Sequence, residues 1–337
     1  MHPILLRIPI PGLDHPLTIY GYGAMLCVGF LLAIWVAARR ARRLGQSPDI
    51  IYNIALFCFL GGIFRARAFY VIQYGGQFRS LLDFIKIWEG GLTFYGGFLL
   101  AVAAVLVYLK AARLPMLYWL DVIAPSVALG LAFGRLGCFL NGCCYGDVCP
   151  AGWGFAWPAG SIPWQHYADQ HLAATGLAAS GEAADAAVTG GLVAAWQAPA
   201  IYPTQLLSFV NAMLLFAVLH FMFERKRRHG QVIFSFVVLY GVTRFLLEYL
   251  RADEAAAYLL GLPTLLGAAG FSEAAARLPR LTISQNVAIV MVVLGGAAMV
   301  WLLRSRLPGL QADDVPPAPA APPVGAPRAK HGKEKGS

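Results

Sequence analysis

The sequence predicts an all-α polytopic membrane protein of about seven transmembrane helices, with the N-terminus outside and the C-terminus in the cytoplasm. Hydrophobic residues make up 58% of the 337 residues and charged residues only 13%, which is too little polar surface for a soluble globule of this length. The apolar residues also form runs long enough to cross hydrocarbon about 30 Å thick. Basic residues gather at the ends of these runs.

Seven runs have the length of a transmembrane helix. The first begins near Tyr20 and lacks both a preceding basic region and an A-x-A cleavage site, so we expect it to be a retained span and not a signal peptide. The expected spans are residues 19–38, 51–74, 92–110, 117–140, 204–223, 231–250 and 283–303.

Basic clusters that follow alternate spans predict the orientation. Loops on the cytoplasmic side are enriched in Lys and Arg, so each odd-numbered span is expected to end in the cytoplasm. The net charge of +9 is then explained by membrane anchoring, and nucleic acid is not an expected partner. The clusters are Arg39, Arg40, Arg42 and Arg43; Lys110 and Arg113; Arg225, Lys226, Arg227 and Arg228; and Arg304 and Arg306.

The chain is expected to form one transmembrane domain over residues 1–306. A long segment at about 141–203, rich in Ala, Gly and Trp, would lie outside as a surface excursion. Residues 307–337 are Pro/Ala-rich and then basic, a composition that predicts a disordered cytoplasmic tail.

Ionisable residues inside the spans indicate a candidate site, because each costs roughly 2.5–3.5 kcal/mol to insert. Arg135 lies near the outer end of the fourth span between glycines, and Asn141 follows further out. In the sixth span, spacings of four, four and three residues predict one polar helical face. Both groups lie toward the external leaflet, where two guanidiniums suit the phosphate of an anionic lipid. The residues of the polar face are Tyr240, Arg244, Glu248 and Arg251.

Two features of the second and third spans leave alternatives open. Arg65 and Arg67 lie within the second span and are equally compatible with a functional and a structural role. The glycine-rich stretch from Trp88 to Gly97 is either a loop that lines a cavity at the entry to the third span or a simple turn.

Four cysteines follow a C-x4-C-C-x4-C pattern, Cys138, Cys143, Cys144 and Cys149. This pattern lacks the paired C-x2-C spacing typical of structural zinc sites. The last three would lie in an oxidising compartment. We therefore expect a disulfide between Cys149 and one of the two adjacent cysteines.

The run from Gly134 to Gly142, GRLGCFLNG, resembles the G-R-x-G-N-F-x-N-G-E signature of the prolipoprotein diacylglyceryl transferase family. Further similar blocks occur in the same order as in that family, so the resemblance covers about residues 18–305. These blocks are Tyr22-Gly23, Trp88 to Gly97, Tyr202 to Leu206, Tyr240 to Arg251 and, more weakly, Thr282 to Gln285.

The resemblance implies transfer of the diacylglyceryl group of phosphatidylglycerol to the lipobox cysteine of a prolipoprotein signal peptide, in the bacterial inner membrane. Glycerol phosphate would be released, and no cofactor or metal is implied. Residues 1–306 would then be the catalytic domain. The implied catalytic residues are Arg244, Glu248, Tyr95 and Asn141, and the implied phosphatidylglycerol-binding residues are Arg135, Tyr22, Tyr240 and Arg251.

The chain departs from the family pattern at four positions. Cys138 stands where the signature has Asn, and Cys143 where it has an acidic residue. Tyr95 replaces the usual His, and Ser208 the usual acidic residue after the P-[ST]-Q-L block. The general base is therefore left unassigned.

One alternative function is a redox or metal protein built on Cys138, Cys143, Cys144 and Cys149. The other is a membrane transporter of an anionic or lipid-like substrate. A transporter predicts charges throughout the membrane depth and internal sequence symmetry. The sequence shows neither.

Overall fold

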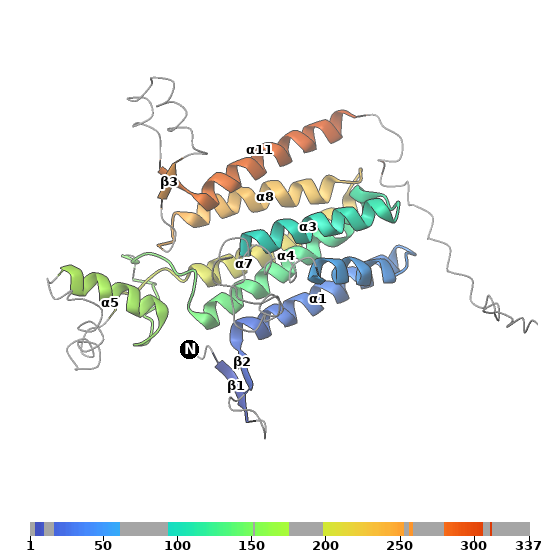
Figure 1. The fold of residues 1–337 in the computed structure, drawn as a ribbon. Coiled ribbons are helices and arrows are strands. Elements are labelled where there is room, and N and C mark those ends of the chain that lie inside the picture. Colours follow the sequence, from blue (N-terminus) through green and yellow to red (C-terminus); the bar gives the residue numbers. More distant parts are fainter. Residues whose placement is uncertain are drawn as a thin grey trace, which may run out of the picture.

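The computed structural model describes residues 4–9, 17–60, 94–150, 152–174, 198–252, 256–258, 280–305 and 311. Within these ranges, five helices are long and apolar enough to cross a membrane, which confirms a multi-pass, mainly helical protein (Figure 1). They are α1 (Gly21–Arg43), α4 (Met116–Asn141), α7 (Thr204–Arg225), α8 (Gln231–Glu248) and α11 (Ile283–Arg304).

The observed bounds of these five helices agree with the predicted spans to within about five residues. A shorter apolar helix, Asp49–Leu60, covers the start of the second predicted span, and α3 (Phe94–Ala111) corresponds to the third. Residues 61–93, which include Arg65 and Arg67, lie outside the described residues, and so does the tail apart from Gln311.

The helices expose apolar side chains on their outer surface, as a membrane solvent requires. Leu31 is 60% exposed, Leu214 61% and Leu294 64%, although each lies in the middle of a long helix. Side chains such as Trp119 and Leu219 are buried between the helices. Apolar side chains thus lie on the outer surface as well as in the core.

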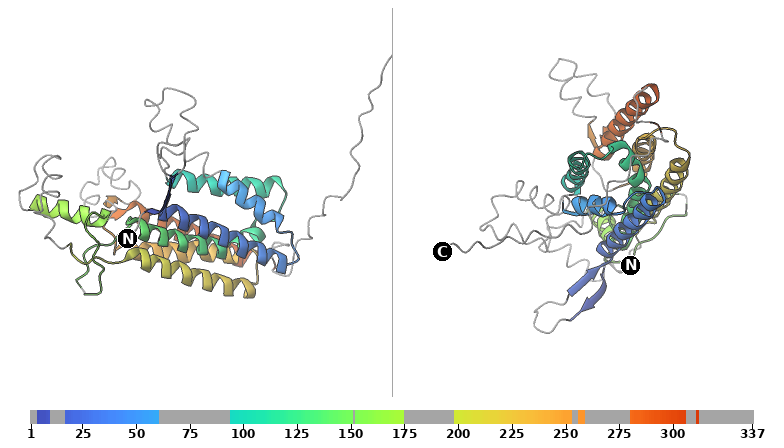
Figure 2. Two further views of the ribbon diagram at one scale, coloured as in Figure 1. Left: turned by 90° about the horizontal axis from the view of Figure 1, so that it is seen from below. Right: turned by 90° about the vertical axis from the view of Figure 1, so that its right-hand side faces the viewer.

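Helix α4 is the centre of the bundle. In its membrane-spanning window 56% of residues are buried, against 22% in each of the other four long helices. It packs against α1, α7 and α8, and α11 packs against α8. The right-hand view of Figure 2 looks along the bundle.

Glycines allow the helix backbones to approach closely at two crossings. A Cβ atom at Gly29 of α1 would lie 2.6 Å from Cβ of Phe133 in α4. A Cβ atom at Gly241 of α8 would lie 2.9 Å from the side chain of Val292 in α11. Small residues at such contacts are typical of membrane bundles.

A buried carboxylate, Asp121 of α4, holds the start of α8 in place. Its Oδ1 accepts from the backbone N–H groups of Val232 (3.1 Å) and Ile233 (2.9 Å). Its Oδ2 accepts from the backbone of Gly230 (2.9 Å) and from Nζ of Lys226 (3.0 Å). Burial lowers the pKa of Lys226, and the charge of Asp121 opposes that shift. The carboxylate thereby satisfies the unpaired N–H groups of the first helical turn.

Secondary structure beyond the spans gathers at one end of the bundle (Figure 1). Two antiparallel hairpins, β1 (Ile4–Ile8) with β2 (Leu17–Tyr20) and β3 (Ala256–Tyr258) with β4 (Arg280–Thr282), lead directly into α1 and α11. Helix α5 (Ile162–Ala174) lies in the segment that the sequence predicted as a surface excursion. The sequence analysis did not predict these elements, so the fold is not purely helical.

We expect Asp121→Ala to lower the free energy of unfolding by about 3–5 kcal/mol, because it leaves the buried ammonium of Lys226 unpaired. The measurement is denaturant unfolding in detergent micelles. The matched control is Asp169→Ala, which removes an exposed carboxylate and should change stability by less than about 0.5 kcal/mol. Equal effects of the two substitutions would contradict the assignment.

Candidate active site

A cleft between α4, α7 and α8 brings together polar side chains that lie far apart in the sequence. Arg135 enters it from α4 and Arg244 from α8, with Tyr240 one helical turn before Arg244. Ser208 and Asn211 are contributed by α7. Two guanidiniums therefore share one cavity inside a membrane bundle. The lining residues are Leu131, Arg135, Ser208, Asn211, Ala212, Tyr240, Arg244 and Leu247.

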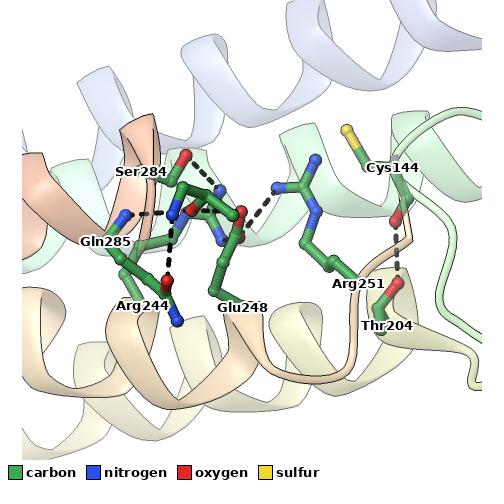
Figure 3. Close-up of polar contacts among 8 residues, drawn as sticks. Cys144, Thr204, Arg244, Glu248, Arg251, Ser284 and Gln285 are labelled. Atoms are coloured by element: carbon green, nitrogen blue, oxygen red, sulfur yellow. Dashed lines mark hydrogen bonds and ion pairs between the residues drawn. The ribbon is translucent and has the colours of Figure 1, made fainter. Parts of the chain in front are cut away.

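The carboxylate of Glu248 organises two arginines next to this cleft (Figure 3). Its side chain is fully buried, and its Oε2 forms an ion pair with Nη1 of Arg244. Nη1 of Arg251 lies 3.7 Å from the same oxygen. A carboxylate between two guanidiniums offsets part of their positive charge and holds them in defined positions.

The prediction that Arg251 lies on the polar face of the helix is wrong. Helix α8 ends at Glu248, so Arg251 lies in the segment that follows and not on the helix. The backbone N–H of Arg251 donates to the carbonyl of Glu248 (3.1 Å). This turn brings its guanidinium back toward Glu248.

The start of α11 supplies two hydroxyls that the sequence analysis did not assign to the site. Nη2 of Arg244 donates to Oγ of Ser284 (2.7 Å), and Oγ1 of Thr282 donates to Oε1 of Glu248 (2.9 Å). Thr282 also forms a capping box with Gln285. The T-x-x-Q pattern of a capping box is the sequence signal that could have identified Thr282, because it predicts that the hydroxyl of this residue lies at a helix start.

Arg135 differs from Arg244 in its surroundings. Among the described residues it has no carboxylate partner, although Tyr240, Cys144 and Cys138 lie within electrostatic range. A guanidinium in a membrane bundle normally pairs with an anion. The cleft thus presents a cation available to an anionic ligand.

Tyr22 and Asn141 lie at the cysteine-containing end of α4. The ring of Tyr22 packs across Gly137, where a Cβ atom would lie 3.2 Å from Cδ2. Tyr22 lies within electrostatic range of Arg135, and the amide of Asn141 donates to the sulfur of Cys143. The remaining predicted residue is Tyr95. Its backbone belongs to α3, and its side chain lies outside the described residues.

The chain reverses direction after α4. Gly142 has a φ of 80° and Cys144 a φ of 60°, left-handed conformations that end the helix. Oγ1 of Thr204 donates to the carbonyl of Cys144 (2.7 Å), and Nε2 of Gln205 to that of Cys143 (3.0 Å). The start of α7 therefore clamps this loop against the end of α4.

The expected disulfide with Cys149 is absent, since all six cysteines are free thiols. Cys143 and Cys144 turn back to Cys138, so that the three sulfurs lie within 4.8 Å of one another. Cys149 is buried elsewhere and accepts from the hydroxyl of Tyr202. The left-handed turn after α4 is the physical reason for the difference.

The surroundings of Cys144 favour its thiolate form. The neighbouring thiols of Cys138 and Cys143 lower the pKa of the Cys144 thiol. The positive charges of Arg251 and Arg135 lower it further. The charges of these two arginines are therefore coupled electrostatically to the cysteine cluster.

Comparison with known proteins identifies the family to which this arrangement belongs. Residues 10–301 match the family described as prolipoprotein diacylglyceryl transferase. The chain belongs to this family. The resemblance seen in the sequence motifs is confirmed by a match that covers most of the chain.

Individual relatives carry the name phosphatidylglycerol–prolipoprotein diacylglyceryl transferase. The protein of Ralstonia pickettii is 31% identical over 300 residues, which cover 86% of this chain and 91% of the relative. That of Vibrio cholerae is 29% identical over 297 residues, covering 87% and 90%. The protein of Rhodopirellula baltica is 41% identical over 160 residues, covering 45% of this chain but 32% of the relative.

A double-mutant cycle tests the coupling of Glu248 to Arg251. We expect Glu248→Gln and Arg251→Gln each to destabilise the protein, and the double variant to lose less than the sum by about 1 kcal/mol or more. Unfolding in detergent micelles gives the three free energies. Arg42→Gln, which changes an exposed arginine, replaces Arg251→Gln in the control cycle. If Glu248 couples no more strongly to Arg251 than to Arg42, the described ion pair is incorrect.

Proposed function

We propose that this chain transfers the diacylglyceryl group of phosphatidylglycerol to the thiol of a lipobox cysteine in a prolipoprotein, with release of glycerol phosphate. The main observation that supports this proposal is that Arg135 and Arg244 line one cleft inside a membrane bundle. Membership of the transferase family supports the reaction. Relatives covered over about nine tenths of their length are named for both substrates.

Arg135 is proposed to bind the phosphate of the lipid headgroup. It has no carboxylate partner among the described residues, and a planar guanidinium makes two parallel hydrogen bonds to phosphate. Tyr240 lines the same cleft and would donate its hydroxyl to the headgroup. Arg251, which lies between Glu248 and the cysteine loop (Figure 3), would add a second positive charge.

Arg244 is proposed to stabilise the leaving phosphate. Glu248 and Ser284 hold its guanidinium, so the donors are oriented before the reaction begins. In the reaction the sulfur of the acceptor attacks the glycerol carbon that bears the phosphate. A C–S bond forms while the C–O bond breaks, and the electron pair of that bond goes to the phosphate oxygen. Preorganised donors at such an oxygen are a large source of catalysis.

The other proposed residues complete the pocket. Tyr22 and Asn141 lie at the end of α4 beside the cysteine loop, where an acceptor peptide would approach the cleft. Tyr95 is proposed from the family resemblance alone.

We also propose seven spans in the bacterial inner membrane, with the N-terminus outside. Helices α1, α7 and α11 all have basic residues in their last turn, which supports a common cytoplasmic end under the positive-inside rule. Residues 1–306 would form the single catalytic domain and 307–337 a cytoplasmic tail. The cleft then opens toward the outer leaflet.

We expect Arg135→Ala and Arg244→Ala to lower the transfer rate by at least about 100-fold, the typical effect of removing one preorganised donor. Arg135→Lys should also be severely impaired, because it retains the charge but loses the planar fork. The assay follows a diacylglyceryl adduct on a prolipoprotein in membranes with equal amounts of inserted enzyme. Arg42→Ala is the control and should stay near wild type. Wild-type activity of Arg135→Ala would refute the proposed site.

The orientation is tested with a reporter that is active only in the cytoplasm. Fused after Arg228 it should be active, and fused near Ser180 it should be inactive, because the basic clusters follow the odd-numbered spans. The reverse pattern would invert the topology and move the site to the inner leaflet.

A further inference from the structure

The three clustered thiols have no role in the proposed binding of the lipid phosphate. Cys138 belongs to the last turn of α4 and is buried, whereas Cys143 and Cys144 belong to the loop and are half-buried. Their sulfur atoms lie within 4.8 Å of one another. Because Thr204 and Gln205 hold the two loop carbonyls, this proximity is built into the fold.

The cluster has the dimensions of a thiolate metal site. Zinc–sulfur bonds of about 2.3 Å place the sulfurs of one zinc ion about 3.8 Å apart. The observed upper limit of 4.8 Å therefore requires a contraction of at most about 1 Å. Soft thiolate ligands also select zinc over the hard cations magnesium and calcium.

The charges around the cluster favour such a complex. Three thiolates and one Zn²⁺ carry a net charge of −1. Arg251 and Arg135 both lie within electrostatic range of Cys144. An anionic complex there is compensated, whereas an isolated buried anion would be costly.

We propose that Cys138, Cys143 and Cys144 bind one zinc ion whose open fourth position receives and activates the acceptor thiol. Catalytic zinc sites keep three protein ligands and one exchangeable position. A thiol that coordinates zinc loses its proton. This inference rests on the proposed function, since it concerns the thiol that the reaction alkylates.

The step balances without oxidation or reduction. The acceptor thiol binds zinc and releases its proton to water, and the resulting thiolate attacks the glycerol carbon. The neutral thioether then leaves the metal, and glycerol phosphate departs with the electron pair of the broken C–O bond. Among the described residues, the eight that line the cleft include no histidine and no carboxylate. A metal-bound thiolate supplies the deprotonation that these residues do not.

Metal content gives the first test. Full-length protein, purified in detergent micelles with a reductant, is equilibrated with Zn²⁺, freed of excess metal and analysed by mass spectrometry of the element. We expect about one zinc per chain in the wild type and in the controls Cys27→Ser and Cys149→Ser. Cys143→Ser and Cys138→Ser/Cys144→Ser should retain little zinc. Wild-type protein that binds no zinc, or a triple-cysteine variant that binds as much, would overturn the site.

Cobalt reports whether the fourth position is open. Co²⁺ bound by the wild type should show thiolate-to-metal charge-transfer absorption that Cys143→Ser lacks. A short peptide with a lipobox cysteine should change the ligand-field spectrum, and the same peptide with serine should not. An unchanged spectrum with the cysteine peptide would overturn the activating role. Unfolding curves accompany each variant, and the peptide comparison uses wild-type protein, so misfolding of a variant does not decide the result.

Activity separates this inference from the proposed function. Removal of zinc with a chelator should lower transfer at least about 100-fold, the lower range for assisted proton removal, and added Zn²⁺ should restore it. Full transfer by metal-free protein would overturn the zinc inference and leave the proposed function intact. One bound zinc with no transfer under any condition would refute the proposed function, and with it the activating role.

Discussion

A bilayer offers no hydrogen bonds, so each buried charge of this protein must be satisfied by another part of the chain or by a bound ligand. Two carboxylates meet this constraint at opposite ends of α8. Asp121 accepts from Lys226 and from the first turn of α8, and Glu248 pairs with Arg244 and Arg251 near its last turn. Asp121 thereby connects α8 to α4, and Glu248 connects α8 to the start of α11 through Thr282. The charges that are costly in lipid thereby orient the helices that form the cleft.

Among the described residues that line the cleft, the distribution of these partners leaves Arg135 for a ligand. Glu248 is shared by two guanidiniums and receives a hydrogen bond from Thr282. Arg135 faces the same cleft without a carboxylate partner among the described residues. A lipid phosphate between Arg135 and Arg244 would supply the missing anion. Structural stability and substrate binding therefore depend on the same set of charges.

The loop after α4 places the cysteine cluster, a group of soft metal ligands, next to this proposed phosphate site. Its reversal requires Gly142 and Cys144 at positive φ, and the start of α7 fixes it through Thr204 and Gln205. Arg251 lies within electrostatic range of Cys144 and contacts Glu248. The two reacting partners, a phosphate ester and a thiol, would thus meet groups of matching chemistry on either side of Arg251.

The sequence by itself determined the membrane class, the positions of the long helices and the family. Apolar run length is a local property, so the bounds of α1, α4, α7, α8 and α11 agree with the predicted spans. The spacing of four residues likewise indicated the Arg244–Glu248 pair, since the two lie on one helical turn. Only the tertiary structure placed Arg135 beside Arg244, set Arg251 beyond the end of α8 and gathered Cys138 with Cys143 and Cys144. Those contacts depend on how separate helices pack and on two left-handed residues, and neither is encoded in a spacing along one helix.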